Sequence, residues 1–195
     1  MVLPPFDENG GLPTGDYVLT LNELQASFLV TGDGVKLGPD AEWARAWREK
    51  LVKQLRTLVS QLQAAGVTDI FIDGSFATDK PRPNDIDGYF IPSPRTQTGS
   101  LRERADAWDQ VRGNLLKTSA LWDWSPSSLS YHPDTRKKER AQWHRFRVDL
   151  WPHVPGVIFA EYDAKAHRSV EFPEFFRRHK VSYVPRGIIR IGGLT

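Results

Sequence analysis

The chain has 195 residues, of which 39% are hydrophobic, and its formal net charge at pH 7 is +2. That length is enough for one sizeable hydrophobic core with room for a small appended subdomain. Because the chain contains no cysteine, disulfide frameworks and thiolate metal sites are excluded. The charge balance is mild, so any preference for nucleic acid has to come from a local basic patch.

The sequence shows no signal for a membrane or for export. Residues 1–6 lack the basic segment and the long apolar segment of a signal peptide. No apolar run in the chain approaches the length of a membrane span. We therefore expect a cytoplasmic protein with no membrane partner.

The first third of the chain predicts an arm and two helices. Residues 1–19 are rich in proline and glycine, which favours an extended arm on the surface. Thr20 and Glu23 form the sequence pattern of a capping box, so a short helix should begin there. The longest helix should run from a cap at Asp40 to about Ala65. Its predicted apolar stripe consists of Trp43, Trp47, Leu51, Leu55, Leu58 and Leu62.

The two tryptophans of this stripe leave two interpretations open. Trp43 and Trp47 could stack on a nucleobase, but a helical spacing of four is more typical of core residues. Gly66 supplies the C-terminal stop of the helix. We expect the helix to pack behind the strand that follows it.

The centre of the chain combines a glycine turn with paired acids. Residues 67–73 are β-branched and aromatic and predict a buried strand, which ends at Gly74 and Ser75. A second strand begins at Asp85 and Asp87. Alternate strand residues share a face, so these carboxylates should point the same way, about 6.5–7 Å apart. Magnesium sites usually combine one or two carboxylates with substrate phosphates. The stretch therefore predicts a phosphate cradle beside a metal platform.

A third strand is expected from Arg145 to Trp151, after a helix over 101–117. Alternation would place Arg147, Asp149 and Trp151 on one face of it. An acid in an apolar strand is costly to bury unless it is paired or binds metal. Asp149 is therefore either a metal ligand or the partner of Arg147 or Arg145 in an ion pair.

The remaining segments carry weaker signals. Residues 134–140 are a basic run, which is either a solvated face or a surface that contacts phosphate or RNA. Residues 172–180 predict a short helix, and residues 181–184 and 187–191 predict short strands. The histidines at 153, 167 and 179 show no metal-ligand spacing.

The central stretch consists of Gly74-Ser75, the nine-residue loop 76–84 and the Asp85-x-Asp87 pair. This combination resembles the nucleotidyltransferase superfamily typified by DNA polymerase beta, especially its minimal members. Three segments also resemble an uncharacterised bacterial family of such proteins, the domain of unknown function 6932. These segments read LPxGxYxxTL from Leu12, IDGSFxTDKxxPNDID from Ile72 and RGIIRI from Arg186.

The resemblance implies an α+β fold in which a mixed sheet is flanked by helices around a nucleotidyltransferase-like core. We expect a single domain over residues 1–195. Residues 1–35 would form the arm and short helix, residues 40–155 the core and residues 156–195 a C-terminal extension.

The resemblance also implies two-metal phosphoryl transfer from a nucleoside triphosphate such as ATP. Asp85 and Asp87 would hold Mg²⁺ or Mn²⁺, and Asp149 would complete the catalytic set. Gly74 and Ser75 would contact the phosphates. Lys80, Arg147 and Arg186 are the candidates for neutralising the charge on the leaving pyrophosphate.

The acceptor implied by the resemblance is a hydroxyl of a protein, an RNA or a small molecule. A tRNA or a partner protein in a toxin–antitoxin or phage-defence setting would fit. One alternative is a non-catalytic antitoxin or anti-defence protein on the same fold. Another is an RNA-binding module that uses the basic segment 136–147.

Two departures from the family pattern bear on the mechanism. The loop 78–84 lacks the Arg-Gly and Ser-Asp form of the minimal enzymes, and Pro81 and Pro83 remove two amide donors from it. The chain is also too short for a helical second domain. Both departures favour a minimal enzyme that works with a partner or on a macromolecule that completes the site.

Overall fold

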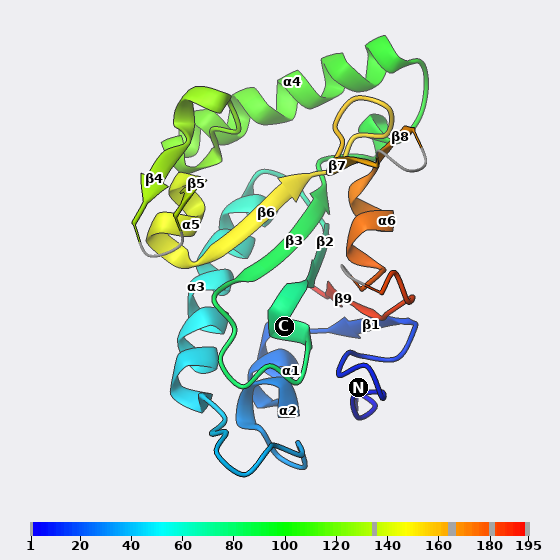
Figure 1. The fold of residues 1–195 in the computed structure, drawn as a ribbon. Helices are drawn as coiled ribbons and strands as arrows, with labels where there is room; N and C mark the ends of the chain where they lie inside the picture. Colours follow the sequence, from blue (N-terminus) through cyan, green and yellow to red (C-terminus); the bar gives the residue numbers. More distant parts are fainter. Residues whose placement is uncertain (1, 134–135, 164–166, 180–181, 194–195) are drawn as a thin grey trace.

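The computed structural model describes residues 2–133, 136–163, 167–179 and 182–193. An α+β arrangement is seen, with one mixed five-stranded sheet and helices around it (Figure 1). The strands lie in the order β1 (Asp16–Leu19), β9 (Ile188–Ile191), β2 (Asp69–Asp73), β3 (Ile86–Ile91) and β6 (Val148–Pro152). The outer pairs, β1–β9 and β3–β6, are parallel, and the two inner pairs are antiparallel.

Most helices cover one face of this sheet. They are α1 (Leu21–Ala26), α2 (Phe28–Thr31), α3 (Arg45–Ala64) and α4 (Leu101–Thr118). Strand alternation turns Ile70, Ile72, Phe90 and Leu150 towards them, and these side chains join one large core with the apolar stripe of α3. The predicted packing of the long helix behind the β2 strand is confirmed.

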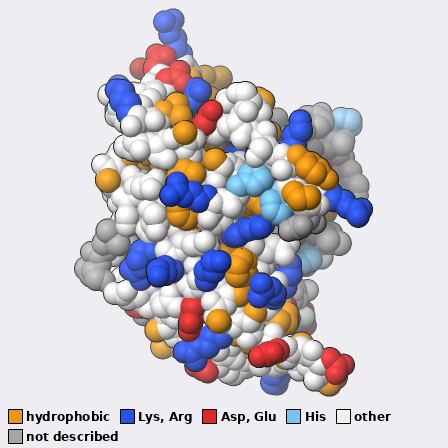
Figure 2. Space-filling view, turned by 90° about the vertical axis from the view of Figure 1, so that its left-hand side faces the viewer, with side chains coloured by type: hydrophobic (Ala, Val, Ile, Leu, Met, Phe, Trp, Pro, Cys, Tyr) orange, Lys and Arg blue, Asp and Glu red, His pale blue; other side chains and the backbone are white. Residues whose placement is uncertain are grey.

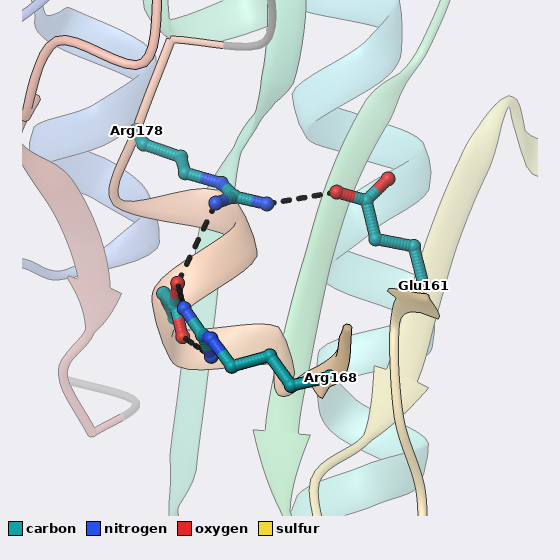
Figure 3. Close-up of polar contacts among 4 residues, drawn as sticks. Glu161, Arg168 and Arg178 are labelled. Atoms are coloured by element: carbon teal, nitrogen blue, oxygen red, sulfur yellow. Dashed lines mark hydrogen bonds and ion pairs between the residues drawn. The ribbon is translucent and has the colours of Figure 1, made fainter. Parts of the chain in front are cut away.

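The opposite face of the sheet carries a smaller aromatic cluster under α6 (Phe172–Phe176). Phe71 and Tyr89 stack with ring centroids 4.7 Å apart, and Phe176 lies 6.0 Å from Tyr89. An ion-pair network joins α6 to the small hairpin of β7 (Glu161–Asp163) and β8 (Arg168–Val170) (Figure 3). In it Arg178 bonds Glu161 at 2.8 Å.

The predicted capping box is confirmed, whereas the predicted start of the longest helix is wrong. Thr20 accepts from the Glu23 amide, and the Glu23 carboxylate accepts from the Thr20 amide. Asp40 caps nothing, because α3 begins only at Arg45 and its cap residue is Ala44. Trp43 stays outside the helix because its indole N–H donates to the Val30 carbonyl at 3.1 Å.

The two ends of the chain contribute neighbouring strands to the sheet. The arm supplies β1, and the C-terminal segment supplies β9, which lies between β1 and β2. The strand predicted over 181–184 is not formed by residues 182–184, and residue 181 lies outside the described residues.

Two further segments complete the fold on the side of β6. A hairpin of β4 (Ser130–His132) and β5 (Lys137–Glu139) leads into α5 (Ala141–Phe146). Short 3-10 turns lie at Gly74–Ala77, Pro94–Thr96, Ala120–Trp122 and Pro126–Ser128. None of the helices described is both long and apolar enough to cross a membrane.

Candidate functional site

Three aspartates form a row across neighbouring strands on the face that carries α6. Asp73 of β2 pairs in register with Asp87 of β3, and Asp87 pairs in register with Asp149 of β6. Residues directly opposite each other on paired strands point to the same face. The expectation that Asp87 and Asp149 share a face is therefore confirmed. Asp73 was not predicted as a site residue. Its position two residues after Phe71 in the strand was a signal that the two side chains share a face.

The row lies directly beside the aromatic layer under α6. The next register row along these strands is Phe71, Tyr89 and Trp151. Phe71 and Tyr89 are buried in the α6 cluster, and Trp151 packs against it. The acid row therefore lies one step along the same face from the aromatic rings under α6, at the ends where β3 and β6 begin and β2 finishes.

Gly74 makes the turn that places the acids so close to the backbone. Its φ angle is +72°, which favours glycine, and a Cβ atom there would collide with the Asp87 carboxylate. The turn continues as the 3-10 segment that contains Ser75, whose carbonyl accepts a bond from the Thr78 hydroxyl at 2.9 Å. The predicted end of the strand at Gly74 is confirmed, because β2 finishes at Asp73.

Indole groups hold two of the predicted acids. Asp85, just before β3, accepts from the Trp143 indole N–H at 2.7 Å, so α5 fixes its carboxylate. Asp149 accepts from the Trp151 indole at 2.9 Å through Oδ2. Its other oxygen, Oδ1, is buried and has no hydrogen-bond partner. Such an oxygen is costly unless a proton or a cation satisfies it.

Burial and neighbouring carboxylates raise the proton affinity of Asp87 and Asp149. Burial raises the pKa of Asp87 well above its ordinary value, and the charges of Asp85, Asp149 and Asp73 raise it further. Burial also raises the pKa of Asp149 to about 6, although the Trp151 bond and a nearby arginine oppose the shift.

Two buried or half-buried arginines flank the row. Arg186 approaches Asp73 with 2.6 Å between Nη2 and Oδ2, so this predicted residue does reach the site. Arg140 was missed by the sequence analysis, because it appeared only as one charge in a basic run. Its guanidinium lies 4.1 Å from the centre of the Trp151 ring, and its Nε and Nη1 atoms have no partner. Its charge lowers the proton affinity of Asp149.

The other two predicted cations lie differently. Lys80 is exposed in the loop after the turn. The prediction that Arg147 shares a strand face with Asp149 is wrong, because the strand begins only at Val148. Arg147 ends α5 in a left-handed conformation with φ of 51°. Its guanidinium lies 3.9 Å from the centre of the Trp143 ring, and neither ion pair predicted for Asp149 is formed.

A buried arginine on α3 holds the loop that joins the turn to the acids. Arg48 is fully buried and donates to the carbonyls of Leu29 and Phe76 at 2.7 and 2.8 Å. It also donates to the Lys80 carbonyl at 2.5 Å. Next to it, the Trp47 indole donates to the Pro83 carbonyl at 2.6 Å. Trp47 was predicted to be a core residue. It is instead half-buried, and its indole group helps to hold the loop.

The donor chemistry of the row suits a divalent cation. Carboxylate oxygens are what Mg²⁺ prefers, and the unpartnered Oδ1 of Asp149 is one such oxygen. Among the residues that the structure describes, however, no three acidic or histidine side chains converge closely enough to hold a metal ion. The backbone sets the acids in register, and metal binding would require the carboxylates to turn towards a common point.

The pKa of Asp149 predicts a pH effect on the metal-free protein. A carboxyl whose pKa rises from 3.8 to about 6 on folding binds its proton more tightly in the native state. Stability should therefore fall as the pH rises from about 4 through 6, and the full effect of one such shift is about 3 kcal/mol. We expect urea unfolding in a chelator to show lower stability at pH 8 than at pH 5.

The Asp149→Asn variant should lack most of the pH-dependent change in stability that comes from this carboxyl. Asp69→Asn is the matched control, because Asp69 lies on β2 outside the row and pairs with Arg190 at 2.5 Å. A pH profile that is identical for the wild type and Asp149→Asn would contradict the burial of this carboxyl.

Fold and site together define an α+β protein with an acidic row on a mixed sheet, beside a glycine turn. The chain belongs to the Family of unknown function (DUF6932), whose model matches residues 4–192. Comparison with the curated proteins and with the solved structures gave no match.

Proposed function

We propose that the protein is a metal-dependent nucleotidyltransferase that moves a nucleoside monophosphate from a triphosphate to a hydroxyl group. The observation that carries this proposal is the register of Asp73, Asp87 and Asp149 across three strands. Neighbouring acids repel one another, and divalent cations that hold a phosphate group would compensate their charge.

Each residue of the site has a role in this proposal. Asp85, Asp87 and Asp149 would hold the ions, which when bound would stabilise the attacking and leaving oxygens of an in-line displacement. The raised proton affinity of Asp149 suits a group that accepts the proton of the attacking hydroxyl. Gly74 and Ser75 would let the triphosphate approach the backbone.

The flanking arginines suit the charge of the substrate. Arg140 has two buried nitrogens without a partner, and a movement of its side chain would let them donate to phosphate oxygens. Arg186 would fix Asp73 and neutralise the pyrophosphate from the side of β2. These two residues are better placed for this role than the exposed Lys80 or Arg147, which packs on Trp143.

A pocket next to the row can take the nucleoside part of the substrate. Trp151, which bonds Asp149, also lines a pocket of about 350 Å³ together with Trp108, Trp124 and Arg112. Pockets of this size that are lined by aromatic side chains and a few polar groups suit small flat ligands. Trp151 would then connect a purine or pyrimidine ring in this pocket to Asp149.

The direct test is transfer of a labelled nucleotide. Purified protein is incubated with each α-labelled triphosphate, Mg²⁺ or Mn²⁺, and cell extract as the source of acceptor. We expect one triphosphate to label an extract component, and a chelator to abolish the labelling. The proposal is overturned if no triphosphate is transferred and if neither metal nor triphosphate raises the melting temperature.

A further inference from the structure

The side of the molecule next to β6 carries a basic surface, which we call the hairpin face. It consists of the exposed side chains of β4, β5 and α5, together with Arg136 just before β5. Figure 2 shows this side, where Lys and Arg side chains lie across the middle near histidines and hydrophobic side chains. The Asp and Glu side chains in that view lie mostly towards its top and bottom.

The described cations of the hairpin face form no close ion pairs, although the charge of Lys137 lowers the proton affinity of Glu139. Arg136, Lys137, Lys138 and Arg145 are all exposed. Within the described ranges, none of them lies within ion-pair distance of a carboxylate, although other arginines of the protein do. Lys137 and Lys138 are neighbours on β5 and therefore point to opposite sides of the hairpin. Exposed cations that are clustered in one part of the surface attract a polyanion.

Aromatic and imidazole groups lie among these cations. Tyr131 is 61% exposed and pairs in register with Lys138, so a ring and an ammonium group point the same way. The His144 ring lies 2.8 Å from the Ser130 hydroxyl. Exposed rings beside cations are the combination with which proteins bind single-stranded nucleic acid, since the bases stack while the phosphates meet positive charge.

The hairpin face borders the acid row directly. Glu139 of β5 lies close enough to raise the proton affinity of both Asp87 and Asp149. Trp143 of α5 bonds Asp85, and a single residue separates α5 from the strand that carries Asp149. A nucleic-acid strand bound to this face would therefore extend towards the acids.

We infer that the hairpin face binds a single-stranded nucleic acid and presents its terminal hydroxyl to the acid row. The inference that this face binds nucleic acid is argued from the surface alone. The inference that the bound nucleic acid is the acceptor rests on the proposed function. The two parts are separated by measuring binding in a chelator, without nucleotide, and transfer in a second experiment.

Binding is measured by the fluorescence anisotropy of a labelled, unstructured RNA of about 20 nucleotides. We expect the affinity to fall steeply as salt rises from about 50 to 200 mM. The double variant K137Q/K138Q should bind about tenfold more weakly. Loss of two phosphate contacts should also reduce the slope of log affinity against log salt by about 1.4.

Two further variants separate specific contacts from general charge. The control K36Q/R102Q removes two exposed cations that lie on other elements, in the loop after α2 and on the first turn of α4. It should leave both affinity and slope within twofold of the wild type. Tyr131→Leu should weaken binding several-fold and leave the salt slope unchanged, because stacking is lost while the charges remain.

The inference is overturned if K137Q/K138Q binds RNA like the wild type, or if the control loses as much affinity. It is also overturned if the wild type binds polyglutamate but not RNA, since the face would then receive an acidic protein. A DNA strand of the same sequence shows whether the 2′-hydroxyl contributes. If RNA binds through this face but no nucleotide is transferred, the binding surface stands and the proposed function fails.

Discussion

Replacing Arg48 by methionine should lower the free energy of unfolding by about 3–5 kcal/mol. The guanidinium is the buried donor for the carbonyls of Leu29, Phe76 and Lys80. Burial lowers its pKa to about 9, so it is still charged at neutral pH. Methionine fills a similar volume but leaves these carbonyls without a donor, and each buried unsatisfied group costs about 1–3 kcal/mol.

The effect of Arg48 should be specific to its planar fork of donors. Arg48→Lys keeps the charge but cannot reach carbonyls in several directions, so it should recover only a small part of the loss. Arg45→Met is the matched control on the same helix, since Arg45 is exposed and pairs only with Glu49. That surface pair should contribute less than about 1 kcal/mol.

Urea unfolding monitored by tryptophan fluorescence measures both variants. If Arg48→Met unfolds at the same urea concentration as Arg45→Met, the carbonyls must find other donors, and Arg48 does not organise the loop. The loss expected at Arg48 also matters for function, because the loop it holds joins Gly74 to the acids at the start of β3.

Local patterns in the sequence were sufficient to predict the two strands that carry Asp73 and Asp87. The strands around Gly74 and the helix after residue 100 have clear periodicity and caps, and they lie where expected. The helix α5 was missed because its six residues are too few to show a period. That omission caused the wrong assignment of Arg147 to the third strand.

The remaining features of the site depend on contacts between residues distant in sequence. The pairing of β1 with β9 joins the two ends of the chain, and no local pattern predicts such a register. Arg48 looked like one more charge on an amphipathic helix, yet its acceptors lie 19 to 33 residues away. Arg140 was hidden in the same way within a basic run, since only folding places its guanidinium against Trp151.

The second large effect is expected from Asp87→Asn, the central position of the acid row. The substitution is nearly isosteric, so the strand and its packing should survive. Without metal at pH 8, we expect the melting temperature to stay unchanged or rise, because like charges from Asp85, Asp73 and Asp149 no longer crowd a buried carboxylate. Addition of Mg²⁺ should stabilise the wild type and have little effect on the variant.

Nucleotide transfer should fall in the same variant by at least a hundredfold, or about 2.7 kcal/mol of transition-state stabilisation. Asp69→Asn carries the same substitution on β2 and should keep both the Mg²⁺ response and the transfer. These paired readouts decide between an enzyme and an interaction protein on the same fold. If Asp87→Asn abolishes the Mg²⁺ response while the biological effect of the protein persists, the acids serve structure or binding, and the catalytic proposal is wrong.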